Sequence, residues 1–493
     1  MSLIFPKFRI AAGALLALLI ATPAFPQSRV TLQNEVRTEF LHAWNGYKQY
    51  AWGHDDLKPL SKTYHDWYAE PLLMTPVDAL DTMILMGLKD EARTTREYIA
   101  THLSFERDIS VQNFEITIRL LGGLLSSYEL TRDKRLLTLA EDLGNRLLPV
   151  FNSPTGLPYR YVNLKTGAVR GNVTNPAEAG TLLIEFGTLA KLTHRQVFYD
   201  KAKRALVEIY QRRSPIGLVG TWINVETGQW TDTDSHISGA IDSYYEYLLK
   251  CAILFNDQDC RRMWNESLNA INGYLLDTRV TEVRVIANHG PGPPTGIQPT
   301  LWYGHADMNT GKRKATIYGA LDAFFPAVLA LSGHLDDAIL LQDSSFTMWN
   351  LEGIEPEEFD YQTRQITSPA YPLRPEIVES TYYLYHYTLS PTRRISPRAG
   401  ADHERTYYQQ MGETMWRNFV KYCRHDVGYA ALQSVVTKEK SDSMQSFVFA
   451  ETFKYFYLLF APPQTLDFDR VIFNTEAHPI RKQWPPKTTA AKN

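Results

Sequence analysis

A repeated pattern along the chain constrains its fold more than any other feature. Seven segments each place an acidic residue near the start of a long apolar and aromatic run, such as Tyr244 to Phe255 or Tyr455 to Phe460. Helices that are apolar on most sides are buried. We therefore expect seven buried helices, whose acidic residues are Asp78 and Asp81, Glu115, Glu178 and Glu185, Asp242, Asp322, Glu376 and Glu379, and Glu451.

More polar segments separate these runs. Residues 136–150 and 199–212 carry charges on one face, which predicts amphipathic outer helices. Two alternating segments follow, one turning between Asn163 and Gly167 and the other between Asn224 and Gly228 at identical offsets. Both predict β-hairpins that turn at glycine. The repeating unit is therefore an inner helix, an outer helix and a hairpin.

Seven such units predict an all-α fold, a closed (α/α)7 barrel of seven inner and seven outer helices with short β-hairpins at one end. In a closed ring the inner helices all start at the same end, so their acids converge on one cavity. An open α-solenoid also pairs helices. It seldom buries an acid in every inner helix, because an unpaired buried charge is costly. We find no domain boundary inside the array and interpret residues 290–294 as a surface excursion.

The ends of the chain predict export and a frayed terminus. Lys7 and Arg9 precede an apolar run that ends near Ala24, which is typical of a signal peptide. We therefore divide the chain into a signal peptide (1–27), a catalytic domain (28–480) and a disordered tail (481–493). No second long apolar segment occurs, so we expect no stable membrane insertion.

Charge and cysteine content exclude some classes of protein. The 493 residues carry a net charge of −3, so no basic field for nucleic acid is present. The three cysteines form no zinc pattern. Cys251 and Cys260 are close enough in sequence to pair and leave Cys423 free, but three buried thiols fit equally well.

Glu115 and Arg119 lie one turn apart on the second apolar helix, just before Gly122 and Gly123. At a surface this spacing is an ordinary ion pair. In an apolar helix, a buried glutamate suits a general acid, and the glycine pair permits close packing.

Three further segments offer polar groups at helix ends. Asp242 opens the fourth apolar helix, where an N-terminal cap is the simpler interpretation. Arg374, Glu376 and Glu379 open the sixth helix, where the acids suit either the helix dipole or a site for sugar or water. The polar run 473–479 follows the last helix and is either a connector or part of a site.

At these positions the chain resembles glycoside hydrolase family 47, the class I α-mannosidases, over roughly residues 37–480. Six stretches match in order: 77–82, the Glu115 helix, 242–250, 373–380, 447–460 and 473–479. Residues 322–326 and 428–432 are similar to the branch of endoplasmic-reticulum degradation-enhancing mannosidase-like proteins.

The resemblance implies a seven-hairpin (α/α) barrel with Ca²⁺ at its floor, which removes α-1,2-linked mannose from glycans with inversion. By position, Glu115 is the general acid, Glu376 the general base and Asp242 a third essential carboxylate. Thr475 is the Ca²⁺ ligand, through its hydroxyl and carbonyl oxygens. The positions that match contacts to sugar or to water are Arg119, Glu178, Arg374, Glu379, Phe447, Glu451 and Glu476.

One position departs from the family pattern. The processing mannosidases carry an Asp-His pair at the start of the fifth inner helix, where this chain has Ala320-Leu321-Asp322 and no nearby histidine. Looser specificity is therefore expected.

Two other interpretations stay open. One is a calcium-dependent, lectin-like protein that binds mannose glycans with little turnover; the complete set of Glu115, Asp242, Glu376 and Thr475 favours catalysis instead. The other is a six-hairpin barrel, against which the seven acid-bearing segments argue. We expect a monomer that is periplasmic or secreted in a bacterium, or located in the secretory lumen of a eukaryote.

Overall fold

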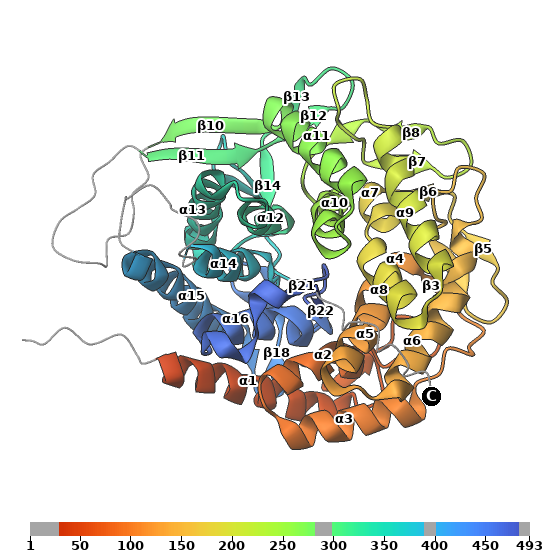
Figure 1. Ribbon diagram of the computed structural model, residues 1–493. Helices are drawn as coiled ribbons and strands as arrows, with labels where there is room; N and C mark the ends of the chain where they lie inside the picture. The colour runs from red at the N-terminus through yellow and green to blue at the C-terminus, as the bar shows by residue number, and fades with distance from the viewer. Residues whose placement is uncertain (1–28, 282–297, 389–400, 483–493) are drawn as a thin grey trace, which may run out of the picture.

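The chain forms a closed double ring of helices (Figure 1). The computed structural model describes residues 29–281, 298–388 and 401–482. The inner ring of these residues has seven helical segments: α2 (Met74–Leu85); α4, η1 and α5 (Asn113–Ile116, Thr117–Leu121, Gly122–Thr131); α7 and α8 (Pro176–Gly180, Leu183–Thr193); α10 (Asp242–Leu254); η3 and α12 (Leu321–Phe324, Phe325–Ser332); α14 (Glu376–Tyr387); and η4 and α16 (Val448–Thr452, Phe453–Phe460).

Seven outer helices surround the inner ring: α1 (Arg29–Tyr50), α3 (Lys89–His102), α6 (Lys134–Leu147), α9 (Gln196–Gln211), α11 (Gln258–Tyr274), α13 (Leu335–Glu352) and α15 (Ala401–Cys423). The first helices close the ring on the last ones: α1 packs on α16, and α2 packs on both η4 and α5. This closure confirms the predicted (α/α)7 barrel.

Amphipathic spacing explains the outer helices. In α6 the buried residues Leu136, Ala140, Leu143 and Leu147 recur every three or four positions, so one stripe faces the inner ring. Asp133 caps this helix by accepting a hydrogen bond from the Arg135 amide.

Several hairpins share one kind of polar turn. The Asn163 and Asn224 side chains each accept hydrogen bonds from the amides two and three residues later. Asp307, Asp360 and Ser434 do the same in later hairpins, so two copies seen in the sequence become five in the described residues. The strands at the first four of these turns are β4 (Tyr161–Asn163) with β5 (Val169–Arg170), β7 (Trp222–Asn224) with β8 (Trp230–Asp232), β12 (His305–Asp307) with β13 (Arg313–Ala315), and β15 (Glu358–Asp360) with β16 (Gln365–Ser368), and the fifth joins β19 (Ala431–Ser434) to β20 (Glu439–Ser441).

Of the further strands, β3 (Ser110–Gln112), β6 (Val173–Thr174), β9 (Asp234–Ser235) and β14 (Ile317–Gly319) each add a third strand to one of these sheets, and the others pair in separate two-stranded sheets. The others are, besides β19 and β20, β1 (Asp56–Lys58), β2 (Thr63–His65), β10 (Leu276–Thr281), β11 (Gln298–Tyr303), β17 (Arg424–His425) and β18 (Gly428–Tyr429).

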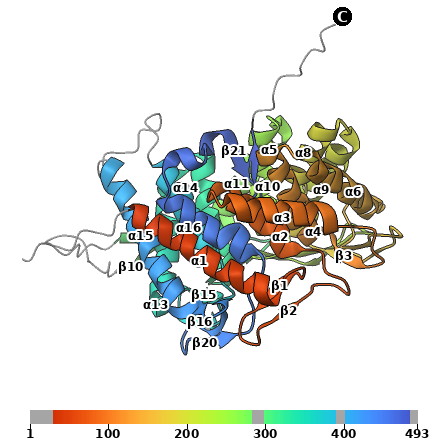
Figure 2. The ribbon, with the colours of Figure 1, turned by 90° about the horizontal axis from the view of Figure 1, so that it is seen from below.

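One hairpin enters the barrel from the opposite end. Strands β21 (Val471–Phe473) and β22 (Pro479–Arg481) pair in antiparallel fashion. Figure 2 shows β21 on the far side of the barrel from β1, β2 and β20. The turn between β21 and β22, residues 474–478, is therefore carried into the interior, where all its residues except Thr475 are buried.

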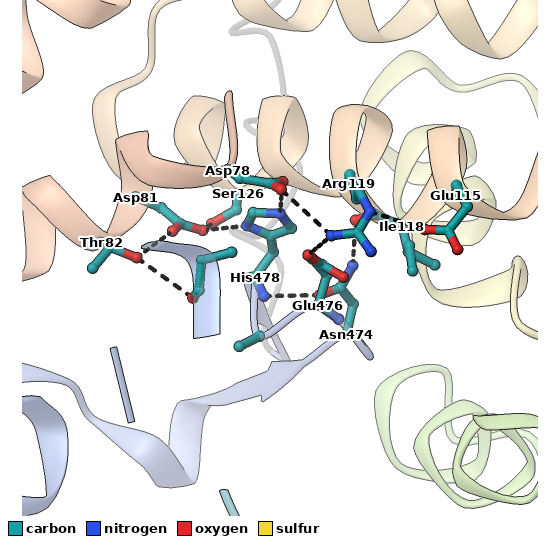
Figure 3. Close-up of polar contacts among 12 residues, drawn as sticks. Asp78, Asp81, Thr82, Glu115, Ile118, Arg119, Ser126, Asn474, Glu476 and His478 are labelled. Atoms are coloured by element: carbon teal, nitrogen blue, oxygen red, sulfur yellow. Dashed lines mark hydrogen bonds and ion pairs between the residues drawn. The ribbon is translucent and has the colours of Figure 1, made fainter. Parts of the chain in front are cut away.

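Asn474 fastens this turn to the inner ring (Figure 3). Its amide Nδ2 donates to the Ile118 carbonyl at 2.8 Å and to Glu185 at 2.8 Å. Its Oδ1 accepts from the amides of Glu476 and His478 at 3.0 and 2.8 Å. Because all four bonds are buried, the turn has one conformation relative to η1 and α8.

The glycine pair in α5 lets the turn approach. A Cβ on Gly122 would lie 2.5 Å from the Asn474 amide nitrogen, and one on Gly123 would lie 3.1 Å from the His478 ring. These distances are shorter than van der Waals contact, so the predicted close packing at this pair is confirmed.

A buried ion network holds the other side of the turn (Figure 3). His478 Nδ1 lies 2.7 Å from Asp81 and Nε2 lies 3.3 Å from Asp78, while Lys454 lies 2.9 Å from Asp81. Burial would lower the pKa of His478, but Asp81 and Asp78 raise it to about 9. Burial would likewise raise the pKa of Asp81, but Lys454 and His478 hold it at about 2. His478 is therefore a cation in the folded protein.

A disulfide joins Cys251 of inner helix α10 to Cys260 of outer helix α11, and Cys423 is a buried free thiol. None of the helices in the described ranges is long and apolar enough to cross a membrane. The signal peptide 1–27, the loop 290–294 and most of the tail 481–493 lie outside the described residues.

The disulfide predicts a redox-dependent stability. Reduction should lower the unfolding free energy by on the order of 2–3 kcal/mol, because the cross-link restricts the unfolded chain. Thermal unfolding with and without reductant measures this. The variant Cys251→Ala/Cys260→Ala should lose the response, while Cys423→Ala should keep it. An unchanged midpoint on reduction of the native chain would contradict the prediction.

The charge on His478 predicts a stability that depends on pH. Its pKa is raised from 6.5 to about 9 on folding. The resulting stabilisation, on the order of 3 kcal/mol, is fully present below pH 6.5 and is lost as the pH rises through 9. Denaturant unfolding between these pH values measures it. His478→Gln should be less stable at pH 6.5 and should lack this loss; an equal pH response in both proteins would refute the assignment.

Candidate active site

One cavity, of about 410 Å³, lies where the inner helices begin. Eleven residues singled out in the sequence line it: Glu115, Arg119, Glu178, Asp242, Arg374, Glu376, Glu379, Phe447, Glu451, Thr475 and Glu476. They come from five inner helical segments or the residues just before them, and from the β21–β22 turn. The predicted convergence on one cavity is confirmed for this set.

Arg119 connects the second inner helix to the turn (Figure 3). Its Nε donates to Glu115 Oε2 at 2.9 Å, its Nη1 pairs with Glu476, and Nη1 also lies 3.7 Å from Asp78. The Arg119 side chain is 8% exposed and Glu115 is 21% exposed. The pair is therefore no ordinary surface ion pair, and it aims a partly exposed carboxyl into the cavity.

Helix geometry contributes to this placement. Arg119 lies in the π-helical turn Thr117–Leu121, and Glu451 lies in a second one, Val448–Thr452. Single π turns inside α-helices rotate the side chains that follow and are frequent at functional sites.

Glu376 is a buried carboxyl beside a cation. Burial raises the pKa of Glu376 to about 7, against the lowering effect of Arg374. The Arg374 guanidinium is held by Glu357, with Nε 3.1 Å from Oε2. Glu376 Oε2 has no hydrogen-bond partner among the described residues. This carboxyl can therefore accept a proton from a molecule in the cavity.

Asp242 is the first residue of α10, yet its contacts are not those of a simple cap. Its Oδ1 accepts from the amide and hydroxyl of the next residue, Ser243, at 2.7 and 3.2 Å. Burial raises the pKa of Asp242 to about 7. Asp242 therefore brings a second carboxyl with a raised pKa to the same cavity.

Three more carboxyls crowd the cavity. Burial and then Glu246 raise the pKa of Glu379 to about 8. Burial raises the pKa of Glu476 to about 8, although Arg119 opposes the rise, and burial and then Glu476 raise that of Glu451. Carboxyls that raise each other's pKa hold excess negative potential, which a bound cation would relieve.

The donor set around Thr475 fits a hard cation. Neither the hydroxyl nor the carbonyl oxygen of Thr475 accepts a hydrogen bond from any described residue, while its amide donates to Tyr247 at 3.3 Å. The described residues lining the cavity offer oxygen ligands but no thiol or imidazole. Oxygen-only sites suit Ca²⁺.

Glu178 lies in the cavity wall, and both of its carboxylate oxygens accept hydrogen bonds. It pairs with Arg160, with Nε 2.5 Å from Oε2, and accepts from Gln112 Nε2 at 2.9 Å. Gln112 also lines the cavity. Such a fixed carboxylate suits hydrogen bonding to sugar hydroxyls.

Some acids of the predicted set do not reach the cavity. Asp78 and Asp81 bind His478, and Glu185 binds Tyr247 and Asn474, one turn or more further along their helices. Asp322 accepts from the Gly319 amide, while its neighbours Leu321 and Phe324 line the cavity. The expectation that every inner helix contributes an acid to the site is wrong, because several buried acids instead bind partners within the barrel wall.

The sequence interpretation missed Glu246 and Glu357. Glu246 lines the cavity and pairs with Lys250, whose Nζ also lies 3.4 Å from the Asn474 carbonyl. Its position, four residues after Asp242, places it on the same helix face and was a usable signal. Glu357 arrives from a hairpin, for which the sequence held no such signal.

Known proteins share this chain's sequence and fold. The profile of glycosyl hydrolase family 47 matches residues 39–482. Alpha-mannosidase I MNS5 of Arabidopsis thaliana is 34% identical over 479 residues, covering 91% of this chain and 77% of that protein. The human ER degradation-enhancing alpha-mannosidase-like protein 2 is 33% identical, covering 91% and 77%. The structure of an alpha-1,2-mannosidase from Trichoderma reesei superposes with a TM-score of 0.80 at 27% identity, covering 93% of this chain and all of that one.

The family profile spans nearly the whole described barrel, and the eleven predicted residues meet in one cavity. The chain belongs to glycosyl hydrolase family 47.

Proposed function

We propose that the chain is an exo-acting, inverting α-1,2-mannosidase that requires Ca²⁺ and removes terminal mannose from mannose-containing glycans. The observation that carries the proposal is the cavity that gathers Glu115, Asp242 and Glu376 from three inner helical segments around Thr475. The mannosidase names of its relatives support the substrate class.

The contacts of the two glutamates support distinct roles. Glu115, partly exposed and held by Arg119, donates its proton to the glycosidic oxygen as that bond breaks. Glu376, buried with one free carboxyl oxygen, takes a proton from the water that attacks the anomeric carbon. Attack opposite to the leaving group yields β-mannose, and carboxyls on separate helices leave room for that water. Asp242 adds a third carboxyl beside the reacting sugar.

The Thr475 oxygens, with water and nearby carboxylates, would hold the cation. A bound Ca²⁺ supplies a point of attachment for sugar hydroxyls and helps to hold the ring in a distorted form. The remaining residues orient the sugar: Phe447 offers a flat apolar face, and Glu178, Arg374, Glu379, Glu451 and Glu476 offer polar contacts.

We also propose that the protein is an exported monomer, in which a catalytic domain of residues 28–480 follows a cleaved signal peptide. The Cys251–Cys260 disulfide supports export, because structural disulfides persist in oxidising compartments. N-terminal sequencing of the mature chain tests cleavage near residues 24–27, and a start at Met1 would overturn the export proposal.

Hydrolysis of α-1,2-mannobiose should release β-mannose first, because inversion sets the configuration of the product. NMR follows the anomeric signals with Ca²⁺, after chelation, and after Ca²⁺ is restored. Chelation should stop release and also lower the thermal midpoint, because a bound ion stabilises the folded state.

Initial α-mannose, or release that survives chelation, would contradict this prediction. Calcium-dependent binding of the disaccharide without release would support the lectin-like alternative instead. The apolar Leu321 and Phe324 on the fifth inner helix, which lacks the processing enzymes' histidine, would then be the first residues to replace.

Glu115→Gln and Glu376→Gln should each lower kcat by on the order of 10²–10⁴-fold. Only Glu115→Gln should regain rate on an aryl mannoside with an acidic leaving group, because such a group departs without protonation. Steady-state kinetics on both substrates measure this. Glu226→Gln, an exposed hairpin residue, is the matched control. Equal behaviour of the two glutamine variants on the aryl substrate would refute the assignment of roles.

A further inference from the structure

We propose that Asp234, His236 and His305 form a metal site that binds Zn²⁺ on the small sheet of β9, β12 and β13 (Figure 1). Each residue offers one ligand atom, an imidazole nitrogen or a carboxylate oxygen, and the three atoms lie within 4.8 Å of one another. None of the three residues is among the described residues that line the active-site cavity. The site is therefore separate from the oxygen ligands around Thr475.

Strand pairing brings the three side chains together. β9 and β12 are antiparallel, with Asp307 opposite Asp234. Two steps further along this register, His305 lies opposite His236, and the two imidazole rings stack with their centroids 4.4 Å apart. Asp234 and His236 are two residues apart on one strand, so both side chains lie on the face that carries His305. Two neighbouring chain segments thus present three ligands on one face.

A buried threonine leaves His236 with a free nitrogen. The Thr221 hydroxyl donates its single hydrogen to the Asp234 carbonyl at 2.7 Å, so it accepts a hydrogen bond from His236 Nε2 at 3.2 Å. The lone pair of the ring is then on Nδ1, which has no hydrogen-bond partner among the described residues. His236 is only 6% exposed, and an unpaired nitrogen at this depth points to a bound group. Histidines that bind metals commonly donate their other ring N–H in this way.

The donor set favours a transition metal over Ca²⁺. Two imidazoles and one carboxylate suit Zn²⁺, whose fourth ligand is then a water molecule, whereas Ca²⁺ prefers oxygen ligands. Nitrogen ligands at about 2.0–2.1 Å from a tetrahedral ion lie about 3.3 Å from each other. The separation of up to 4.8 Å between the ligand atoms therefore closes by at most about 1.5 Å, which side-chain rotation supplies.

The charges around the cluster and its exposure also suit a cation. Asp234 Oδ2 lies 2.9 Å from His305 Nδ1, and Lys314 Nζ lies 3.4 Å from Asp234 Oδ1. The side chains of Asp234 and His305 are 23% and 18% exposed, so an ion can reach them from solvent. The Lys314 side chain is 43% exposed and can withdraw into solvent when an ion takes its place beside Asp234.

A bound ion would stabilise one wall of the active site. His236 precedes the short segment that leads into α10, in which the Asp242 amide donates to the Ser238 carbonyl at 3.0 Å. Gly239 and Ala240 of this segment line the active-site cavity. The ion would tie the segment to β12, and it would act on the stability of the folded barrel without contacting the substrate.

Metal binding by the full chain tests this inference. The protein is freed of metal by chelation and titrated with Zn²⁺ by calorimetry in excess Ca²⁺, which keeps the oxygen ligands around Thr475 occupied. Zn²⁺ should bind with one equivalent and raise the thermal midpoint, because a ligand of the folded state stabilises it. Co²⁺ in its place should give the visible absorption of an ion with nitrogen ligands.

Replacing a ligand should abolish these effects. His305→Gln should weaken Zn²⁺ binding by at least about 100-fold, because loss of a ligand's hydrogen-bond partner alone already costs about 10–100-fold. Asp234→Asn, which keeps the size of the side chain, gives a second test if His305→Gln does not fold. The thermal midpoint without metal shows whether each variant is folded.

His54→Gln is the matched control. His54 Nδ1 lies 2.9 Å from Asp66 Oδ2, the same distance as in the His305–Asp234 pair, but this pair belongs to no group of metal-binding side chains in the described residues. This variant should bind Zn²⁺ as tightly as the native chain. The proposal is overturned if the native chain binds no Zn²⁺ at micromolar concentrations, or if folded His305→Gln and Asp234→Asn bind it unchanged.

Discussion

The cavity depends on one buried amide. Asn474 uses both of its amide hydrogens and accepts two backbone hydrogen bonds, so no polar atom of this side chain is left unsatisfied. Through these bonds the β21–β22 turn is held against η1 and α8, and Thr475 and Glu476 are placed at the starts of the inner helices. Without this turn the inner helices would still surround the cavity with acids, but the cavity would lack the Thr475 oxygens.

The same region concentrates negative charge. Glu379, Glu451 and Glu476 share one space with Glu376 and Asp242, and burial raises the pKa of all five. Arg119 offsets part of this charge by pairing with Glu476, and Arg374, which pairs with Glu357, lowers the pKa of Glu376 against the effect of burial. The barrel tolerates the crowding because two cations, Lys454 and His478, bind Asp81 and hold the β21–β22 turn in place. Such a cluster of carboxyls with raised pKa values is typical of functional sites rather than of parts that serve stability alone.

The fifth inner helix differs in character from the rest. Five of the other six inner segments bring acids to the cavity, whereas this one brings Leu321 and Phe324, and its acid, Asp322, bonds the Gly319 amide. The cavity is therefore polar around most of its wall and apolar on one side. An apolar wall discriminates between ligands by shape more than by hydrogen bonds, which lowers the discrimination available there.

The sequence by itself determined the class of fold and most of the candidate site. Seven acid-bearing apolar runs require seven buried helices, and the offset between Asn163 and Gly167 recurs because one turn geometry joins several of the hairpins. Spacing along a helix could place Glu115 with Arg119, and Glu246 with Asp242, because those pairs share a face. Only the tertiary structure decided which buried acids serve the cavity. Asp78, Asp81 and Glu185 look like Glu115 in sequence, yet they bind His478 and Asn474 from a hairpin more than 280 residues away. It also decided the pairing of Arg374 with Glu357, because contacts between separate elements depend on how the ring closes, and no local periodicity records that.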